Sequence, residues 1–120
     1  MNRSAEDYIK TIYMLKKKTE SIRSIDVARE LGFSKASVST AMANLRKNEI
    51  IIIKEDGDIE FTPKGRKIAA DIYDRYIMLC GFLKDVVGVD ESTAKNDAWK
   101  IGYYISDSTY DGIKRVVNGS

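Results

Sequence analysis

The chain has 120 residues, 43% of them hydrophobic and 32% charged, with one Cys and no His. That length allows one compact unit or one unit with an appended subdomain. We find no apolar run long enough to span a bilayer and no secretion signal, and therefore expect a cytoplasmic protein without a membrane partner. Cys80 lies in the apolar stretch YIMLCGFL, which indicates a core position and not a disulfide.

The charged residues are distributed unevenly along the chain. Residues 1–75 contain 15 Lys and Arg against 12 Asp and Glu, whereas residues 76–120 contain 5 against 6. The N-terminal part is therefore the better candidate for binding an anionic partner, although ordinary solvated surface explains the same difference.

The first segment of the chain predicts an amphipathic helix. Ser4 is placed to cap it, with Asp7 three residues later, and the basic run 16–18 suits its C-terminal end. The apolar positions recur at helical spacing and are Ile9, Ile12, Tyr13 and Leu15.

Two further helices follow with a short turn between them. We expect Ser24 to cap the second helix, Gly32 to end it, and Ser34 to cap the third. The inward positions of the third helix are predicted to be Val38, Ala41, Met42 and Leu45.

The periodicity then changes to that of a β-hairpin. The segment EIIIIKEDGDIEF contains a β-branched run, an Asp56-Gly57 turn and a second alternating segment. Thr62-Pro63 is expected to start a long helix that ends at Gly88, and two more helices are predicted in DESTAKNDAWKIGYYI and SDSTYDGIKRVV. We therefore expect a mostly α fold with a small β wing.

Three helices followed by a hairpin is the order of a winged helix-turn-helix, whose third helix enters the major groove of DNA. The outward residues of the third helix are small or hydroxylic, which suits contact with base edges and phosphates. The predicted contacts to double-stranded DNA are Ser34, Lys35, Ala36, Ser37, Ser39, Thr40, Asn44, Lys47 and Lys54.

The wing segment KEDGDIE is unusual for such an interface. Its four acidic residues are Glu55, Asp56, Asp58 and Glu60, and DNA phosphates repel such charges. Either the wing stays away from DNA or its acidity serves another purpose. An alternative function is therefore a protein-interaction module.

Four segments resemble the diphtheria toxin repressor family, in its manganese transport regulator group. They are SAEDYIKTIYML, VARELGFSKASVSTAMANLRK, FTPKGRKIA and LKDVVGVDESTAKNDA. The resemblance implies a winged helix-turn-helix DNA-binding domain, predicted at residues 1–62, and a helical dimerisation domain, predicted at residues 63–120. It also implies a homodimer that represses transcription under control of manganese or iron; an alternative is that the chain heterodimerises with a metal-sensing relative. The residues themselves argue against an enzyme, since there is no His, Cys80 is expected in the core, and neither a Gly-rich phosphate loop nor a pair of catalytic carboxylates is indicated.

The resemblance also implies metal ligands that this sequence mostly lacks. Asp7 matches the first carboxylate, but the remaining positions of the family's site carry Lys10, Tyr76, Trp99, Gly102 and Tyr103. Manganese and ferrous ions prefer carboxylate and imidazole ligands. We therefore expect a regulator without a metal cofactor, with a relocated metal site as an alternative. One hypothesis is that the Lys10 ammonium replaces the cation beside Asp7 while aromatic rings fill the remaining volume; simple decay of the site is the other.

Overall fold

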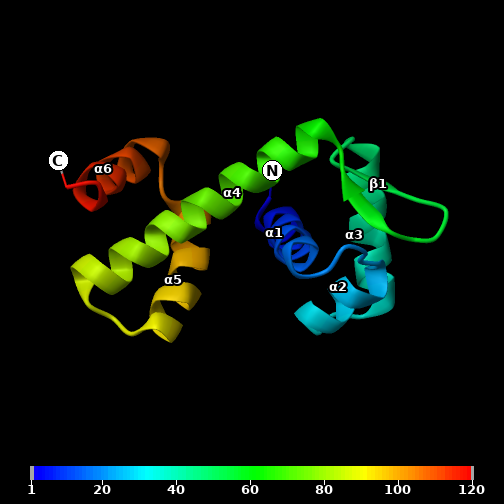
Figure 1. Ribbon diagram of the computed structural model, residues 1–120, viewed down its shortest axis with the longest axis horizontal. Helices are drawn as coiled ribbons and strands as arrows, with labels where there is room; N and C mark the ends of the chain where they lie inside the picture. Colours follow the sequence, from blue (N-terminus) through cyan, green and yellow to red (C-terminus); the bar gives the residue numbers. More distant parts are fainter. Residues whose placement is uncertain (1, 120) are drawn as a thin grey trace. The chain divides into compact units, whose positions relative to one another are not determined.

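The computed structural model describes residues 2–119, which divide into two compact units. The first unit extends to Asp71 and the second begins at Ile72, so the long helix α4 (Pro63–Gly81) contains the boundary. The elements of both units are labelled in Figure 1. The expected boundary between residues 62 and 63 stays a prediction.

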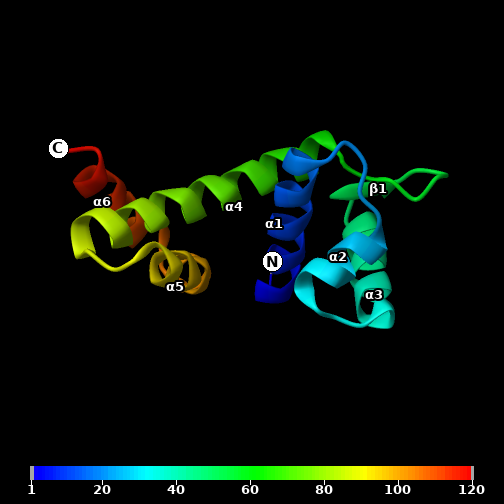
Figure 2. The same ribbon diagram turned by 60° about the horizontal axis from the view of Figure 1, so that its bottom comes forward.

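The first unit contains three helices and one two-stranded sheet. The elements in chain order are α1 (Arg3–Lys18), α2 (Ser24–Leu31), α3 (Lys35–Lys47), β1 (Ile51–Ile53) and β2 (Ile59–Phe61), followed by the start of α4. Helix α2 lies against α3 (Figures 1 and 2). The fully buried side chains of this unit come from every one of its elements before α4 and include Ile9, Ile12, Ile22, Val27, Val38, Met42, Ile51 and Ile59.

The helix ends in this unit follow the predicted turn chemistry with two corrections. Asn2, not Ser4, caps α1, because its side chain accepts a hydrogen bond from the Ala5 amide at 2.8 Å. Arg23, not Ser24, is the N-cap of α2, since the Arg23 amide donates to the Asp26 carboxylate. Gly32 ends α2 in the left-handed conformation with φ of 69°, as predicted.

The predicted hairpin is confirmed as an antiparallel pair. Ile51 lies opposite Phe61 and Ile53 lies opposite Ile59. Gly57 has φ of 90° in the connecting turn, which an L side chain rarely adopts.

The start of α4 is fixed tightly against the α3–β1 connection. The Thr62 hydroxyl donates to the Glu49 carbonyl at 2.6 Å and accepts from the Gly65 amide at 2.9 Å. A Cβ atom at Gly65 would collide with the Ile50 carbonyl group. The Gly in the segment FTPKGRKIA is therefore required by close backbone packing.

The second unit consists of the end of α4 and two further helices. A π-helical segment (Phe82–Val87) continues α4 and ends at Gly88 with φ of 89°, as predicted. Helix α5 (Glu91–Tyr104) is capped by Asp90, and α6 (Asp107–Val117) is capped by Ser106.

The core of the second unit is small and rich in aromatic rings. Its buried residues are Tyr76, Leu79 and Ala98, and partly buried neighbours include Cys80, as expected for a core cysteine. The Arg75 guanidinium donates to the Asp107 carboxylate at 3.0 Å and to the Ile105 carbonyl at 2.9 Å, which connects α4 to α6. Among residues 2–119, no helix has both the length and the apolar character needed to cross a membrane.

Candidate nucleic-acid interface

Helix α3 is held so that one face is buried and the other is open. The Ser37 amide donates to the Ser34 hydroxyl oxygen at 3.1 Å, which confirms the predicted N-cap. Val38, Met42 and Leu45 are buried and fix the rotation of the helix about its axis. The opposite face is therefore available to a partner.

Every residue that the sequence predicts as a DNA contact is exposed. These residues are Ser34, Lys35, Ala36, Ser37, Ser39, Thr40, Asn44, Lys47 and Lys54. The Thr40 hydroxyl donates to the Ala36 carbonyl at 3.1 Å, so its oxygen is left to accept a hydrogen bond. The exposed amide of Asn44 has the donor and acceptor that match an adenine edge. The role of each residue in DNA binding stays a prediction.

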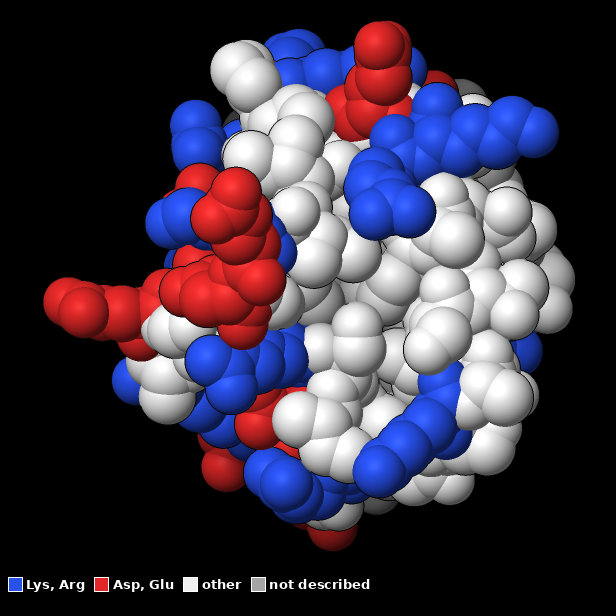
Figure 3. All heavy atoms as spheres, turned by 90° about the vertical axis from the view of Figure 1, so that its right-hand side faces the viewer, with Lys and Arg blue, Asp and Glu red and all other residues white. Residues whose placement is uncertain are grey.

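The surface at this end of the first unit has two different parts. Figure 3 shows acidic side chains gathered on one side and a broad uncharged area, edged by separate Lys and Arg side chains, on the other. Such a surface allows a helix with short side chains to approach DNA closely while basic residues at the edge contact phosphates.

Lys54 in the wing is not a free cation. Its ammonium lies 3.3 Å from the Glu60 carboxylate and 3.9 Å from the Asp58 carboxylate, although its side chain is half exposed. The Glu60 carboxylate, which accepts a hydrogen bond from it, raises the pKa of Lys54 above its ordinary value. A phosphate contact by Lys54 would have to compete with these ion pairs.

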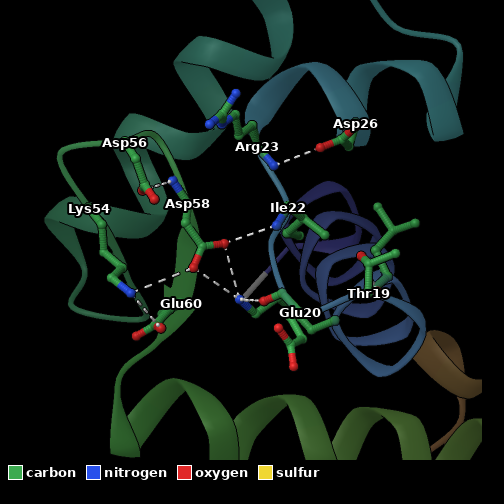
Figure 4. Close-up of polar contacts among 11 residues, drawn as sticks. Thr19, Glu20, Ile22, Arg23, Asp26, Lys54, Asp56, Asp58 and Glu60 are labelled. Carbon is green, nitrogen blue, oxygen red and sulfur yellow. Dashed lines mark hydrogen bonds and ion pairs between the residues drawn. The ribbon is translucent and has the colours of Figure 1, made fainter.

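Asp58 is the buried acidic residue of the wing, with 5% exposure. It accepts a hydrogen bond from the Ile22 amide at 2.9 Å and from the Lys16 ammonium at 3.2 Å (Figure 4). The Asp56 side chain in turn accepts a hydrogen bond from the Asp58 amide at 2.9 Å. The acidic wing is thus partly explained by contacts inside the first unit.

Opposing effects act on the pKa of Asp58. Burial raises this pKa. The hydrogen bond from the Ile22 amide and the charge and hydrogen bond of Lys16 together lower it by more, so the pKa of Asp58 lies below its ordinary value. Asp58 is therefore an ionised carboxylate at neutral pH. In the sequence Asp58 is only one of four wing acids, and no local pattern indicates its partner Lys16, which lies 42 residues away.

The positions at which the family resemblance implies metal ligands belong partly to the first unit and partly to the second. Asp7 and Lys10 lie on α1 and are both partly buried. In the second unit, Tyr76 on α4 and Trp99 on α5 are in edge-to-face contact, with ring centroids 5.9 Å apart. A Cβ atom at Gly102 would lie 3.2 Å from the Leu79 side chain, so this position serves close helix packing. Tyr103 contacts Tyr104, at 5.0 Å between ring centroids.

Comparisons with known proteins identify both halves of the chain. Residues 1–59 match the profile described as iron dependent repressor, N-terminal DNA binding domain. Residues 62–119 match the profile described as iron dependent repressor, metal binding and dimerisation domain. The HTH-type transcriptional regulators MntR of Bacillus pumilus and Bacillus subtilis are each 34% identical over 114 residues, which is 95% of this chain and 78% and 80% of theirs. These relatives are regulators, which confirms that the protein is not an enzyme.

Solved structures share the fold at low sequence identity. The metal-dependent transcriptional regulator MtsR is 21% identical with a TM-score of 0.89, over 100% of this chain and 56% of that one. A manganese-dependent transcriptional repressor in complex with manganese is 20% identical with a TM-score of 0.87, over 97% of this chain and 53% of that one. The chain spans about half the length of these two solved chains. The expected winged helix-turn-helix followed by a helical dimerisation domain is confirmed.

The family corrects one expectation from the sequence. We expected no metal cofactor because most ligands are replaced, but the second unit matches the family's metal binding domain. The expectation was wrong because it used only the few positions where the resemblance implies ligands. The match to a metal binding domain rests on the whole of residues 62–119.

The residues present nevertheless do not fit a manganese or ferrous ion at those positions. Within residues 2–119, no group of three His, Cys, Asp or Glu residues is arranged to hold a metal ion. Burial raises the pKa of Tyr76 to about 12, so this phenol stays protonated and is a poor ligand for a divalent ion. The groups with which this chain would bind a metal are therefore not those of the family's site.

The family matches cover the chain from residue 1 to residue 59 and from residue 62 to residue 119 and do not depend on that metal site. The first unit carries the exposed helix and the wing, and the second carries the helices of the dimerisation domain. The chain belongs to the iron dependent repressor family, with its DNA binding domain followed by its metal binding and dimerisation domain.

Proposed function

We propose that this protein is a transcriptional repressor that binds double-stranded DNA as a homodimer, with α3 in the major groove and the wing beside the backbone. The observation that carries the proposal is the exposed face of α3, whose short side chains are presented by the Ser34 cap and by the buried residues behind them. Residues 1–62 would form the DNA-binding domain and residues 63–120 the dimerisation domain. The relatives are bacterial, and bacterial DNA lies in the cytoplasm, so we place the protein there.

The acidic wing was the observation that favoured a protein-interaction module. Asp58 and Glu60 lie in ion pairs with Lys16 and Lys54 inside the first unit. Less of the wing's acidity is therefore left for a partner protein, and this supports the DNA-binding function over the alternative.

A titration of the protein against duplex DNA from upstream of its own gene tests the proposal. We expect binding that weakens steeply with salt, because phosphate contacts release counterions. The titration is repeated with added manganese and with a chelator, because residues 62–119 match a metal binding and dimerisation domain. Absence of binding in low salt, with and without manganese, would contradict the proposed function.

Two substitutions on α3 separate positioning from sequence reading. Lys35→Ala is expected to weaken binding to all duplexes and to reduce the salt slope by about one. Asn44→Ala is expected to cost roughly 1–3 kcal/mol on the preferred site and to relax specificity at one base pair. Lys100→Ala, an exposed change in the second unit, is the matched control and should leave both quantities unchanged.

A further inference from the structure

Among the contacts that attach the wing to the rest of the first unit, two polar ones meet at Ile22. Asp58 accepts from the Lys16 ammonium on α1 and from the Ile22 amide in the α1–α2 connection. The Ile22 carbonyl accepts in turn from the Ile59 amide at 2.8 Å. Both backbone groups of Ile22 are therefore bonded to neighbouring wing residues, as Figure 4 shows for its amide.

The wing needs such an attachment because the hairpin is very short. Each of its strands has three residues. A two-stranded hairpin is at best marginally stable in water without packing against another element. Its direction in space is therefore determined by contacts with other elements: Ile51 and Ile59 are buried, and β1 lies against α3. Among the described residues, Asp58 makes the one such contact that involves a buried charge.

We propose that Asp58 is a positioning residue for DNA binding: by joining the wing to Lys16 and Ile22, it holds the wing where it can contact the DNA backbone. This inference rests on the proposed function, since it concerns how the DNA-binding surface is assembled. It also explains why a DNA-binding wing carries an acidic residue, because this carboxylate acts inside the protein.

The positioning role and simple charge repulsion predict opposite signs. If Asp58 only repelled phosphates, its neutralisation would tighten DNA binding. If it positions the wing, neutralisation weakens binding, because the ion pairs with Lys16 and Lys54 are lost and the wing is no longer fixed. Asp58→Asn is the appropriate change, since the amide oxygen can still accept from Ile22 and only the charge is removed.

The experiment measures DNA affinity at several salt concentrations for wild type, Asp58→Asn and Glu55→Gln. Glu55 is an exposed acid of the same wing and serves as the matched control. We expect Asp58→Asn to bind roughly three- to tenfold more weakly, as for the loss of a charge-assisted hydrogen bond, with a shallower salt slope. Glu55→Gln should bind as wild type or slightly tighter. Equal or tighter binding by Asp58→Asn would overturn the proposal.

The salt slope distinguishes positioning from a general loss of stability. A variant that is only less stable binds with the wild-type slope once the folded fraction is accounted for, whereas loss of wing contacts reduces the slope. Hydrogen exchange at the Ile22 amide in the free protein gives a second reading, and we expect faster exchange in Asp58→Asn.

A second pair of variants keeps the test decisive if Asp58→Asn does not fold. Lys16→Met removes the same ion pair from α1, and Lys18→Met removes an exposed lysine from the same helix end. The proposal requires a larger loss of affinity and slope for Lys16→Met, and equal losses would overturn it. A wild-type protein that binds no duplex would instead overturn the proposed function.

Discussion

The two units differ in the buried side chains that connect their elements. In the first unit, charged side chains connect distant elements, as Asp58 does between the wing and α1. In the second unit, aromatic rings occupy the contact between α4 and α5, as Tyr76 and Trp99 do. The comparison teaches that the first unit buries a charge where the wing meets α1, whereas the core of the second unit is built on Tyr76, Leu79 and Ala98.

The largest expected effect on stability comes from removing an aromatic ring from the core of the second unit. Tyr76→Ala removes a buried ring that contacts Trp99 and Tyr73, and it should lower the free energy of unfolding by about 3–5 kcal/mol. Urea denaturation followed by circular dichroism measures this loss. Tyr104→Ala, at a ring that is 68% exposed, is the control and should cost much less. Similar losses for both variants would show that the ring contact is not part of a core.

A somewhat smaller effect is expected at a glycine of the first unit. Gly65→Ala places a Cβ atom against the Ile50 backbone, 2.8 Å from the carbonyl carbon, and should cost about 2–3 kcal/mol because backbone must move. Gly81→Ala on the same helix meets nothing within 4 Å and should be neutral or stabilising by up to about 1 kcal/mol. Thermal unfolding of the two variants checks this difference, and equal changes would contradict the close packing at Gly65.

Much of the fold was predictable because its signals are local. Each of these signals acts within a few residues of the chain: the Ser34 cap, the glycines at 32, 57 and 88, and the Thr62-Pro63 helix start. The two misplaced caps were adjacent choices: Asn2 and Arg23 lie one or two residues before the expected serines. At α1, Asn2 and Ser4 both carry a side-chain oxygen next to the first helical residue, and at α2 the cap is made by the Asp26 carboxylate three residues after Arg23, so sequence alone does not select the cap residue.

The tertiary contacts of the site were less predictable. The pairing of Lys16 with Asp58 connects residues 42 apart, and no local pattern indicates it. The expectation that no cofactor is bound was wrong, because it rested on a few positions implied by the resemblance, whereas the whole 62–119 segment determines the class of the domain. The exposed face of α3 was predictable, since helical periodicity defines a face without its partner. Its contact with DNA stays a prediction.

The stability of the protein in acid tests the contribution of the buried carboxylate in the first unit. The pKa of Asp58 is lowered in the folded protein, so its contribution to stability is fully present above its ordinary value of 3.8 and is lost as the pH falls through the lower folded value. We expect Asp58→Asn to reduce the difference in stability between pH 5 and pH 2 relative to wild type. Denaturant titrations at several pH values measure it. An unchanged pH profile would mean that other carboxylates dominate acid unfolding.

The stability of the protein in alkali tests the contribution of the buried phenol in the second unit. The pKa of Tyr76 is raised by burial from 10.0 to about 12, so the neutral phenol is favoured in the folded state. Its contribution is fully present below pH 10 and is lost as the pH rises toward 12. The fluorescence of Trp99, the single Trp, reports unfolding beside this ring. Tyr76→Phe should lose less stability than wild type between pH 10 and pH 12, because the replacement has no phenol to ionise. If both proteins lose stability equally over that range, alkaline unfolding does not begin at the aromatic core, and the proposed contrast between a charge-linked first unit and a ring-packed second unit would lose its support at high pH.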